Sequence, residues 1–305
     1  MKTGAQIAGE LAGRVSLATD ICRDEPMAKH TTLRIGGSAD VYIEPVSESD
    51  LSAIVKFCHE GSLPFFVIGR GSNLLVRDGG VRGVVICLAH ASFSRIEVAG
   101  ERLHCGAGAK LKNVAVEAKR NGLGGVEFLE GIPGSVGGAL RMNAGAMGGA
   151  TFNVIESVRF MDHAGKILER SRAGMPVEYR CCALLKDHIA LGAVFRCLPA
   201  PREEIEKRMK EFSERRWASQ PAAPSAGCMF KNPATISAGK LIDELGLKGT
   251  RVGGAVVSTE HGNFIVNDGN ATARDVLELI AILQRRAKDE RGIDLQTEVE
   301  IIGED

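Results

Sequence analysis

Hydrophobic residues recur at helical spacing in several separate stretches of the chain. In residues 47–61, Leu51, Ile54, Val55 and Cys58 fall on one side, a serine starts the stretch and a glycine ends it. This pattern predicts an amphipathic helix. Comparable signals predict a helical segment followed by a connection within residues 1–30, and helices in four further stretches, which are 110–122, 201–217, 238–246 and 272–280. Thr272 and Asp275, at the start of the last stretch, have a pattern close to a capping box.

Short apolar runs bounded by turn residues lie between these helices and predict strands. Two stretches have the pattern of hairpins, 93–108 with a turn at Ala99 and Gly100, and 154–170 with a turn at 163–165. Residues 33–45 are predicted as strand, turn and strand, and single strands are predicted at 63–69, 81–88, 189–199, 254–258, 263–267 and 295–303. This mixture predicts an α+β protein with domain boundaries near residues 90 and 200.

Charge and composition exclude several classes of function. Lys plus Arg balances Asp plus Glu at 38 each, and no basic stripe is present that would follow a phosphate backbone, so nucleic acid is disfavoured as a partner. No apolar run approaches the ~20 residues that span a bilayer. Residues 1–20 lack the apolar core of a signal peptide, so we expect a cytoplasmic protein. The eight cysteines contain no Cys-x-x-Cys pair and the seven histidines are scattered, so neither a metal site nor a disulfide framework is expected.

Glycine is in excess and gathers in two loops. It supplies 37 of 305 residues, about 12% against a usual ~7%. The first loop, "VIGRGSNLLV", follows a predicted strand and comprises Gly69, Arg70, Gly71, Ser72 and Asn73. Leu74 prevents a complete Gly-x-Gly-x-x-Gly dinucleotide motif. The loop by itself is equally compatible with a nest of N–H groups that binds a pyrophosphate and with a simple turn.

The second loop, "GIPGSVGGALRMNAGAMGG", favours the first of these two interpretations. Its candidate cofactor contacts are Gly131, Gly134, Ser135, Gly138 and Asn143. Purely structural loops rarely need so many glycines, and loops that hold ligands often do. Two glycine loops suit a large, flat, phosphate-bearing cofactor held between two α+β units.

Six motifs follow one another along the chain. They are "HTTLRIGGSADVYIEP", "IGRGSNLLV", "FLEGIPGSVGGALRMNAGA", "YR" at 179–180, "PSAGCMFKNPA" and "LQTEVEIIG". In order and spacing, from about residue 20 to the C-terminus, they resemble the UDP-N-acetylenolpyruvoylglucosamine reductase family. The resemblance implies a two-subdomain FAD-binding fold of the vanillyl-alcohol-oxidase and p-cresol-methylhydroxylase type, residues 1–90 and 91–200, with an α+β substrate domain, 201–305. It also implies the shorter form of the family, without an inserted substrate loop, and a monomer.

The resemblance further implies a two-stage reaction in peptidoglycan precursor synthesis. NADPH reduces FAD and leaves, and UDP-N-acetylglucosamine enolpyruvate takes its place. Flavin N5 then gives hydride to the enolpyruvyl methylene, and a proton is added to the adjacent carbon, which yields UDP-N-acetylmuramate.

Several residues receive roles from the same resemblance, and each also has an ordinary structural interpretation. Arg180 matches the arginine that binds the substrate carboxylate, and Glu298 matches its partner. Lys231 and Asn232 are candidate substrate contacts. Taken without the motifs, they would be a surface arginine, the solvated face of a strand and a Lys-Asn-Pro turn.

Cys228 departs from the family pattern, which usually has serine at the position of the proton donor. A thiol has a pKa of about 8.5, so it is mostly protonated at neutral pH, and a developing anion beside it would resist its ionisation further. We therefore expect Cys228 to act as the general acid.

Two other functions are compatible with parts of this sequence. A flavin-dependent oxidase or dehydrogenase of a small alcohol or sugar would share the cofactor fold. A catalytically silent nucleotide-binding module would require that the set of Arg180, Cys228 and Glu298 be disrupted. The motifs around Cys228 and Glu298 argue against the oxidase or dehydrogenase. Arg180 and Glu298 match the residues usual in the family and Cys228 is a plausible acid, which argues against the silent module.

Overall fold

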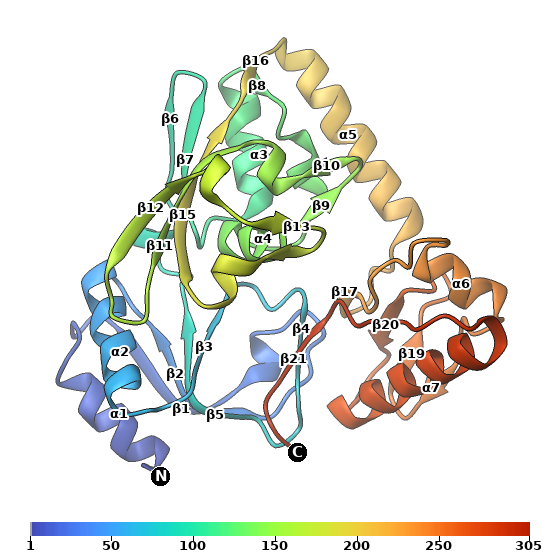
Figure 1. Cartoon of the computed structure of the whole chain (residues 1–305), viewed down its shortest axis with the longest axis horizontal. Helices are drawn as coiled ribbons and strands as arrows, with labels where there is room; N and C mark the ends of the chain where they lie inside the picture. The colour runs from blue at the N-terminus through green and yellow to red at the C-terminus, as the bar shows by residue number, and fades with distance from the viewer. Residues whose placement is uncertain (1) are drawn as a thin grey trace. The chain divides into compact units, whose positions relative to one another are not determined.

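The computed structural model describes residues 2–305 and contains helices mixed with short strands (Figure 1). The α-helices are α1 (Gly4–Ala12), α2 (Glu48–Glu60), α3 (Leu111–Arg120), α4 (Val136–Met142), α5 (Arg202–Ser219), α6 (Ala238–Glu244) and α7 (Ala273–Arg291). Each helix that the hydrophobic spacing predicts is present. Helix α4 lies inside the second glycine loop, where the sequence predicted no helix.

The larger sheets have four, five and four strands. The first has the order β1 (Asp20–Pro26), β2 (Ser38–Glu44), β5 (Val81–Cys87) and β3 (Phe65–Ile68). The second has the order β12 (Ile167–Ser171), β11 (Ile155–Met161), β15 (Ile189–Arg196), β7 (Arg102–Gly106) and β6 (Ile96–Ala99). The third has the order β17 (Ser225–Cys228), β20 (Phe264–Asn267), β19 (Ala255–Val257) and β18 (Arg251–Val252).

Four two-stranded pairs complete the described strands. Three are antiparallel, β9 (Gly145–Ala146) with β10 (Gly149–Ala150), β13 (Val177–Glu178) with β14 (Cys181–Cys182), and β8 (Leu123–Gly124) with β16 (Leu198–Pro199). The fourth is parallel and joins β4 (Leu74–Val76) to β21 (Glu300–Ile302).

The chain divides into two compact units that do not follow a single cut along the sequence. The first comprises the segment ending at Arg23, Val41–Arg70 and Gly83–Arg216, and the second comprises Asp24–Asp40, Gly71–Arg82 and Trp217–Asp305. The division falls inside β1, β2 and β5, and it also separates Arg70 from Gly71 within the first glycine loop. The sequence predicted three domains, two that hold the cofactor (1–90 and 91–200) and one that receives the substrate (201–305). The division into two compact units does not test these roles, so the three domains stay a prediction.

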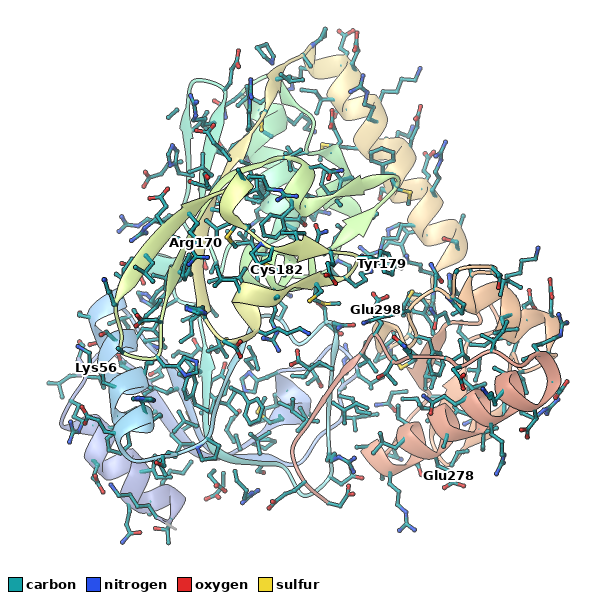
Figure 2. All side chains as sticks on the ribbon, viewed as in Figure 1. Lys56, Arg170, Tyr179, Cys182, Glu278 and Glu298 are labelled. Atoms are coloured by element: carbon teal, nitrogen blue, oxygen red, sulfur yellow. The ribbon has the colours of Figure 1, made fainter. Side chains whose placement is uncertain are left out.

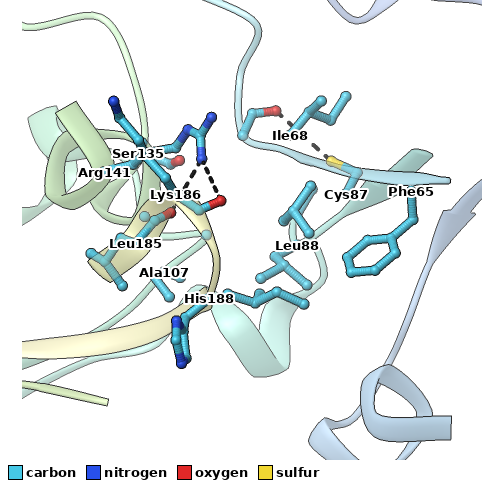
Figure 3. A pocket seen from close by; sticks show the side chains of 18 of the residues that line it. Phe65, Ile68, Cys87, Leu88, Ala107, Ser135, Arg141, Leu185, Lys186 and His188 are labelled. Atoms are coloured by element: carbon cyan, nitrogen blue, oxygen red, sulfur yellow. Dashed lines mark hydrogen bonds between the residues drawn. The ribbon is translucent and has the colours of Figure 1, made fainter. Parts of the chain in front are cut away.

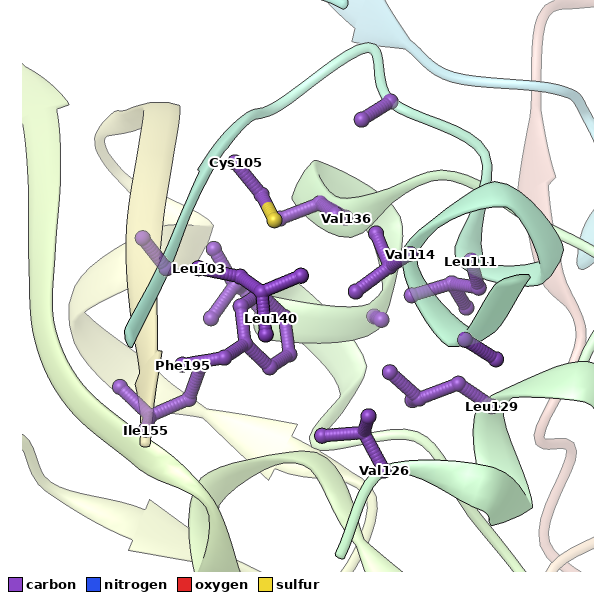
Figure 4. Packing of buried hydrophobic residues seen from close by; sticks show 14 of the residues in the cluster. Leu103, Cys105, Leu111, Val114, Val126, Leu129, Val136, Leu140, Ile155 and Phe195 are labelled. Atoms are coloured by element: carbon purple, nitrogen blue, oxygen red, sulfur yellow. The ribbon is translucent and has the colours of Figure 1, made fainter. Parts of the chain in front are cut away.

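The first unit has two hydrophobic clusters. In one, α3 and α4 pack against the five-stranded sheet, with Leu140, Phe195, Leu103 and Val114 buried between them (Figure 4). In the other, α1 and α2 cover apolar positions of β2 and β5, and residues around Leu191 join the same cluster. Both clusters are continuous with the walls of the cavity described below, so packing of the helices fixes its shape.

The second unit has a core of its own. Helices α6 and α7 lie against the sheet of β17 to β20 (Figure 1), and Leu33, Ile35 and Leu75 are buried in the same cluster. Burial of these three residues explains why the short segments Asp24–Asp40 and Gly71–Arg82 belong to this unit.

Three sequence-based expectations about strands were wrong in detail. Residues 33–37 form no strand, because Leu33 and Ile35 are buried as irregular backbone beside a glycine at φ +131°. Strand β1 lies in a stretch predicted only as a connection. The last strand begins at Glu300 rather than Leu295, so Glu298 precedes it.

Among residues 2–305, no helix is long and apolar enough to cross a membrane. The same part of the chain contains no group of three or more His, Cys, Asp or Glu side chains placed to hold a metal ion.

Helix α7 begins with the capping box that the sequence predicted. Thr272 Oγ1 accepts from the Asp275 N–H at 3.1 Å, and the Asp275 carboxylate accepts from the Thr272 N–H at 2.9 Å. These bonds from Thr272 hold the pKa of Asp275 below its usual value. Asp275 therefore contributes stability that is fully present above its unfolded pKa and is lost as the pH falls through its folded pKa.

We expect Thr272→Ala to lower the free energy of unfolding by about 1 kcal/mol, since an orphan N–H group of the first turn loses its partner. Urea unfolding followed by circular dichroism measures the change. Arg285→Ala, at an exposed position of the same helix, is the matched control and leaves the midpoint nearly unchanged. An equal loss in both variants would contradict the capping role.

Candidate active site

A cavity of about 740 Å³ lies within the first unit. It is bounded by the end of β3, the residues after β5, the turn before α3, the start of α4 and the segment before β15 (Figure 3). Four of the predicted cofactor contacts line it, namely Gly69, Arg70, Ser135 and Gly138. The size is within the ~300–1,000 Å³ of small-molecule and cofactor sites.

Glycine is required where the two loops of this cavity meet. A Cβ on Gly69 would come within 2.4 Å of Ser135 Oγ, so the first loop touches the second at this point. Gly138 is exposed. A Cβ added at Gly138 would lie 3.8 Å from Ser135 Oγ and would have no other heavy atom within 4 Å, apart from the backbone of its own helix and its chain neighbours. A side chain at Gly138 would therefore extend into the cavity, and the bare backbone leaves that space to a ligand.

The cavity wall also carries cations, of which the sequence analysis singled out only Arg70. Lys110, Arg141 and Lys186 line the cavity as well. Arg141 Nη1 donates to the carbonyls of Leu185 and Lys186 at 3.2 and 3.3 Å, which ties α4 to the opposite wall (Figure 3). Arg141 lies within the second glycine loop, and its position in that motif is the feature of the sequence that could have identified it as a cavity residue.

Cys87 is a buried thiol that lines this cavity. Its Sγ donates to the Gly69 carbonyl at 3.9 Å. Burial raises the pKa of Cys87. The thiol therefore stays protonated and remains a hydrogen-bond donor to the Gly69 carbonyl of the first loop.

The remainder of the first loop is built into the second unit. Gly71 has φ +58°, and a Cβ there would meet the His30 carbonyl at 2.2 Å. Thr32 N–H donates to the Gly71 carbonyl at 3.1 Å. These contacts explain why Gly71 must be glycine and why the "HTTLRIGG" motif accompanies the loop.

Cys228 is presented by a β-bulge. Strand β17 pairs with β20 through Ser225 opposite Val266 and Cys228 opposite Phe264, with an irregularity between them. Gly227 lies in this bulge at φ +75°. A bulge turns the following side chain away from the regular alternation, and Cys228 is half-buried while Ala226 and Met229 are buried.

Asn263, which the sequence analysis did not identify, holds the segment after Cys228. Its side chain accepts from the Phe230 N–H at 2.9 Å and donates to the Phe230 carbonyl at 2.8 Å, and its main-chain carbonyl accepts from Met229 N–H at 2.8 Å. Asn263 is 2% exposed. A buried asparagine with three such bonds fixes one conformation of the strand that carries Cys228.

Glu298 lies on the segment beside Cys228. Its N–H donates to the Met229 carbonyl at 2.8 Å, and Thr297 forms a bridge with Phe230. Glu298 is half-buried, whereas Glu300 is exposed. The structure therefore brings two of the three predicted catalytic residues, Cys228 and Glu298, onto adjacent segments of the second unit. Figure 2 labels Glu298, which its partial burial distinguishes from Glu300.

Arg180 belongs to the first unit and occupies a strained turn. Glu178 pairs with Cys181, so Tyr179 and Arg180 form the two-residue loop of a hairpin. Arg180 has φ +56°, a conformation that glycine or asparagine adopts more easily. Its guanidinium lies 5.5 Å from the Tyr179 ring, and Nη1 donates to the Gly145 carbonyl at 3.2 Å.

The remaining predicted contacts have structural partners. Asn143 ends α4 at φ +44°, donates to the Glu178 carbonyl at 3.1 Å and accepts from Phe152 N–H at 3.2 Å. Asn232 Oδ1 accepts from Ala238 N–H at 3.0 Å, and the main chain of Lys231 donates to Gln296 at 2.9 Å. Gly131 and Gly134 do not line the cavity. Direct contacts of these five residues with a ligand stay predictions.

Models of two protein families match the chain. The FAD binding domain matches residues 39–171, and the C-terminal domain of UDP-N-acetylenolpyruvoylglucosamine reductase matches residues 220–302. Reductases of this name from Geobacter metallireducens and Clostridium kluyveri are 46% and 44% identical to the chain. The alignments cover 96% of this chain and 97% of the first protein, and 94% of each chain for the second.

Solved structures agree with these matches. The crystal structure of the reductase from Thermus caldophilus is 40% identical, with a TM-score of 0.80 over 93% of this chain and 98% of that one. Berberine bridge enzyme from Eschscholzia californica is 16% identical, with a TM-score of 0.50 over 64% of this chain and 44% of that one, and shares the fold alone. The predicted FAD-binding fold is thereby confirmed. The chain belongs to the UDP-N-acetylenolpyruvoylglucosamine reductases, flavoenzymes of peptidoglycan precursor synthesis.

Proposed function

We propose that this chain reduces UDP-N-acetylglucosamine enolpyruvate to UDP-N-acetylmuramate with electrons from NADPH, using Arg180, Cys228 and Glu298 as its catalytic residues. The observation that carries the assignment is the adjacency of Cys228 and Glu298 on two segments joined by the bond between Glu298 N–H and Met229 carbonyl. A thiol and a carboxyl held in a fixed relation suit delivery of a proton to carbon.

The cavity of the first unit suits FAD in volume and in the chemistry of its walls. Gly69 and Gly138 offer bare backbone, Ser135 a hydroxyl, and Arg70 and Lys110 positive charge, which suit a pyrophosphate. When bound, FAD supplies the group that accepts hydride from the nicotinamide and donates it to the enolpyruvyl double bond.

The protein residues supply the remaining chemistry of the reduction. Addition of hydride to the methylene carbon pushes an electron pair toward the substrate carboxylate, where negative charge develops. Arg180 is assigned to that carboxylate, because a guanidinium held in a fixed turn needs little reorganisation as the charge grows. Cys228 gives its proton to the adjacent carbon, and Glu298 assists on the carboxylate side. Lys231 and Asn232 are proposed to contact the nucleotide sugar.

We also propose that residues 1–90 and 91–200 hold the cofactor, that 201–305 receive the substrate, and that the enzyme acts as a cytoplasmic monomer of the shorter family form. Support for the compartment comes from the cysteines, all eight of which are thiols rather than disulfides. Burial raises the pKa of Cys58 and of Cys197 to about 12, so these thiols act as core residues. Cysteines kept as thiols in such number are typical of a reducing compartment.

We expect Gly138→Leu to weaken FAD binding by about tenfold or more, because the new side chain occupies space in the cavity. Titration of the apoprotein with FAD, followed by quenching of flavin fluorescence, measures the affinity without turnover. Gly9→Leu is the matched control, since Gly9 lies on exposed α1 with no atom within 4 Å of its Cβ position. Equal affinities for FAD in the two variants would contradict the assignment of this cavity.

Anaerobic spectra test the reaction and the proton donor together. In the unsubstituted protein, NADPH bleaches the flavin band, and UDP-N-acetylglucosamine enolpyruvate restores it. We expect Cys228→Ala to bleach normally but to recover about 10²- to 10⁴-fold more slowly, the usual contribution of a general acid. Cys228→Ser retains substantial recovery, because a hydroxyl can replace the thiol.

The possible results separate the proposals. Recovery only on admission of air would indicate an oxidase. Normal recovery of Cys228→Ala with the enolpyruvyl substrate would leave the reductase in place and remove Cys228 as its acid.

The strained turn at Arg180 gives one prediction about stability and one about activity. We expect Arg180→Gly to be more stable than Arg180→Ala by about 1 kcal/mol, since both lose the guanidinium and glycine alone relieves the left-handed backbone. Both variants lose recovery of the flavin band with substrate. Urea midpoints and the anaerobic assay provide the two measurements, and the usual order, alanine more stable than glycine, would refute the strain.

A further inference from the structure

Three segments distant in the sequence are hydrogen-bonded to one another within the second unit. Strand β4 runs parallel to β21, so residues 74–76 pair with 300–302. Residues 229–231 pair in turn with 296–298, through the bonds of Met229 and Lys231 and the bridge at Phe230. The segment of Glu298 thus has the first glycine loop at one end and the segment of Cys228 at its side.

Asn73, the last residue of that loop, holds Glu298 directly. Its Nδ2 donates to the Glu298 carbonyl at 3.0 Å, and its own carbonyl accepts from the Glu300 N–H at 3.1 Å. The Glu298 N–H is bonded to the Met229 carbonyl. Both main-chain polar groups of Glu298 therefore have partners. The N–H donates to a main-chain carbonyl, and the carbonyl accepts from the side chain of Asn73.

Thr32 makes a corresponding link on the other side of the loop. Its N–H donates to the Gly71 carbonyl at 3.1 Å, and its Oγ1 donates to the Ser225 carbonyl at 2.7 Å. Ser225 begins strand β17, which ends at Cys228. A Cβ at Gly71 would overlap the His30 carbonyl, so the main chain of the segment that carries Thr32 lies directly against this part of the loop.

We propose that Asn73 and Thr32 are positioning residues that hold the first glycine loop in register with Glu298 and Cys228. Asn73 acts through the Glu298 main chain and Thr32 through the β17 main chain. The side-chain amide of Asn73 donates to the Glu298 carbonyl, so we assign Asn73 to the second unit instead of to the cofactor contact that the sequence analysis expected of it. This inference rests on the proposed roles of Cys228 and Glu298.

The effect of losing Asn73 is specific to one half of the reaction. Reduction of the flavin by NADPH does not use Glu298, whereas recovery of the flavin band with substrate does. A small displacement of a catalytic group lowers a rate strongly, by as much as about 10²-fold for ~1 Å. The ratio of the two rates therefore reports the position of Glu298, and a general loss of stability would not change that ratio selectively.

The experiment measures both half-reactions of Asn73→Ala and Asn73→Asp by anaerobic stopped flow, together with FAD affinity by fluorescence. We expect the rate of reduction and the FAD affinity to stay within about twofold, and recovery with substrate to slow by about 10- to 100-fold. Asp keeps the shape of Asn but lacks the N–H donor, so it tests the hydrogen bond without a cavity. Glu300→Gln is the control, since the main-chain bond of Glu300 to Asn73 is retained.

Thr32 provides an independent pair of variants. Thr32→Val removes the hydroxyl with little change in shape, and we expect it to slow recovery selectively as well. Thr32→Ser keeps the donor to the Ser225 carbonyl and restores the rate.

The outcomes distinguish this inference from the function on which it rests. Failure of the unsubstituted protein to recover with substrate contradicts the proposed reaction. Normal behaviour of that protein, combined with equal slowing of both half-reactions or with weakened FAD binding in the Asn73 variants, contradicts the positioning role. Unchanged recovery in the Asn73 and Thr32→Val variants does so too.

Discussion

The hydrogen bond from Glu298 N–H to the Met229 carbonyl, 2.8 Å long, is the contact around which the catalytic part of the second unit is arranged. It joins the end of the chain to the strand that carries Cys228. The strand is rigid on its other side because the buried side chain of Asn263 bonds both main-chain groups of Phe230. The two side chains to which we assign catalytic roles, a thiol and a carboxyl, are thus carried by segments that main-chain bonds hold together, and these bonds do not have to change during a reaction of the side chains.

Positive φ occurs on the segments that carry the proposed catalytic residues. Gly71 and Gly227 have positive φ on the two segments that Thr32 connects, and Arg180 has positive φ without being glycine, as Arg34 and Met147 also do. An arginine in the left-handed region costs about 1–2 kcal/mol. The role that we propose for the Arg180 guanidinium at the substrate carboxylate accounts for this cost, and the surrounding hairpin and the Gly145 carbonyl hold the side chain.

Local patterns in the sequence predicted the regular elements well, and long-range pairing accounts for most of what they missed. The capping residues of α7 and the hairpin at 154–170 depend on neighbours in sequence and were found. Asn73 was assigned to the cofactor because its motif suggested so, and nothing local indicates that its amide reaches a residue 225 positions away. The same holds for Asn263, whose importance depends on pairing of β17 with β20. Leu33 and Ile35 follow a strand-like alternation, yet both are buried in the core of the second unit as irregular backbone.

The main chain around Cys228 bears on the expectation that a thiol stands where the family resemblance leads us to expect serine. Main-chain bonds of Met229 and Phe230 to Asn263 hold the strand next to Cys228, and the bulge at Gly227 sets the direction of its Cβ. These bonds form on the main chain of neighbouring residues, so serine and cysteine would share them. Exchange of a hydroxyl for a thiol changes the acidity and size of the side chain and leaves these bonds in place. In the role of proton donor that we propose for Cys228, a mostly protonated thiol is competent.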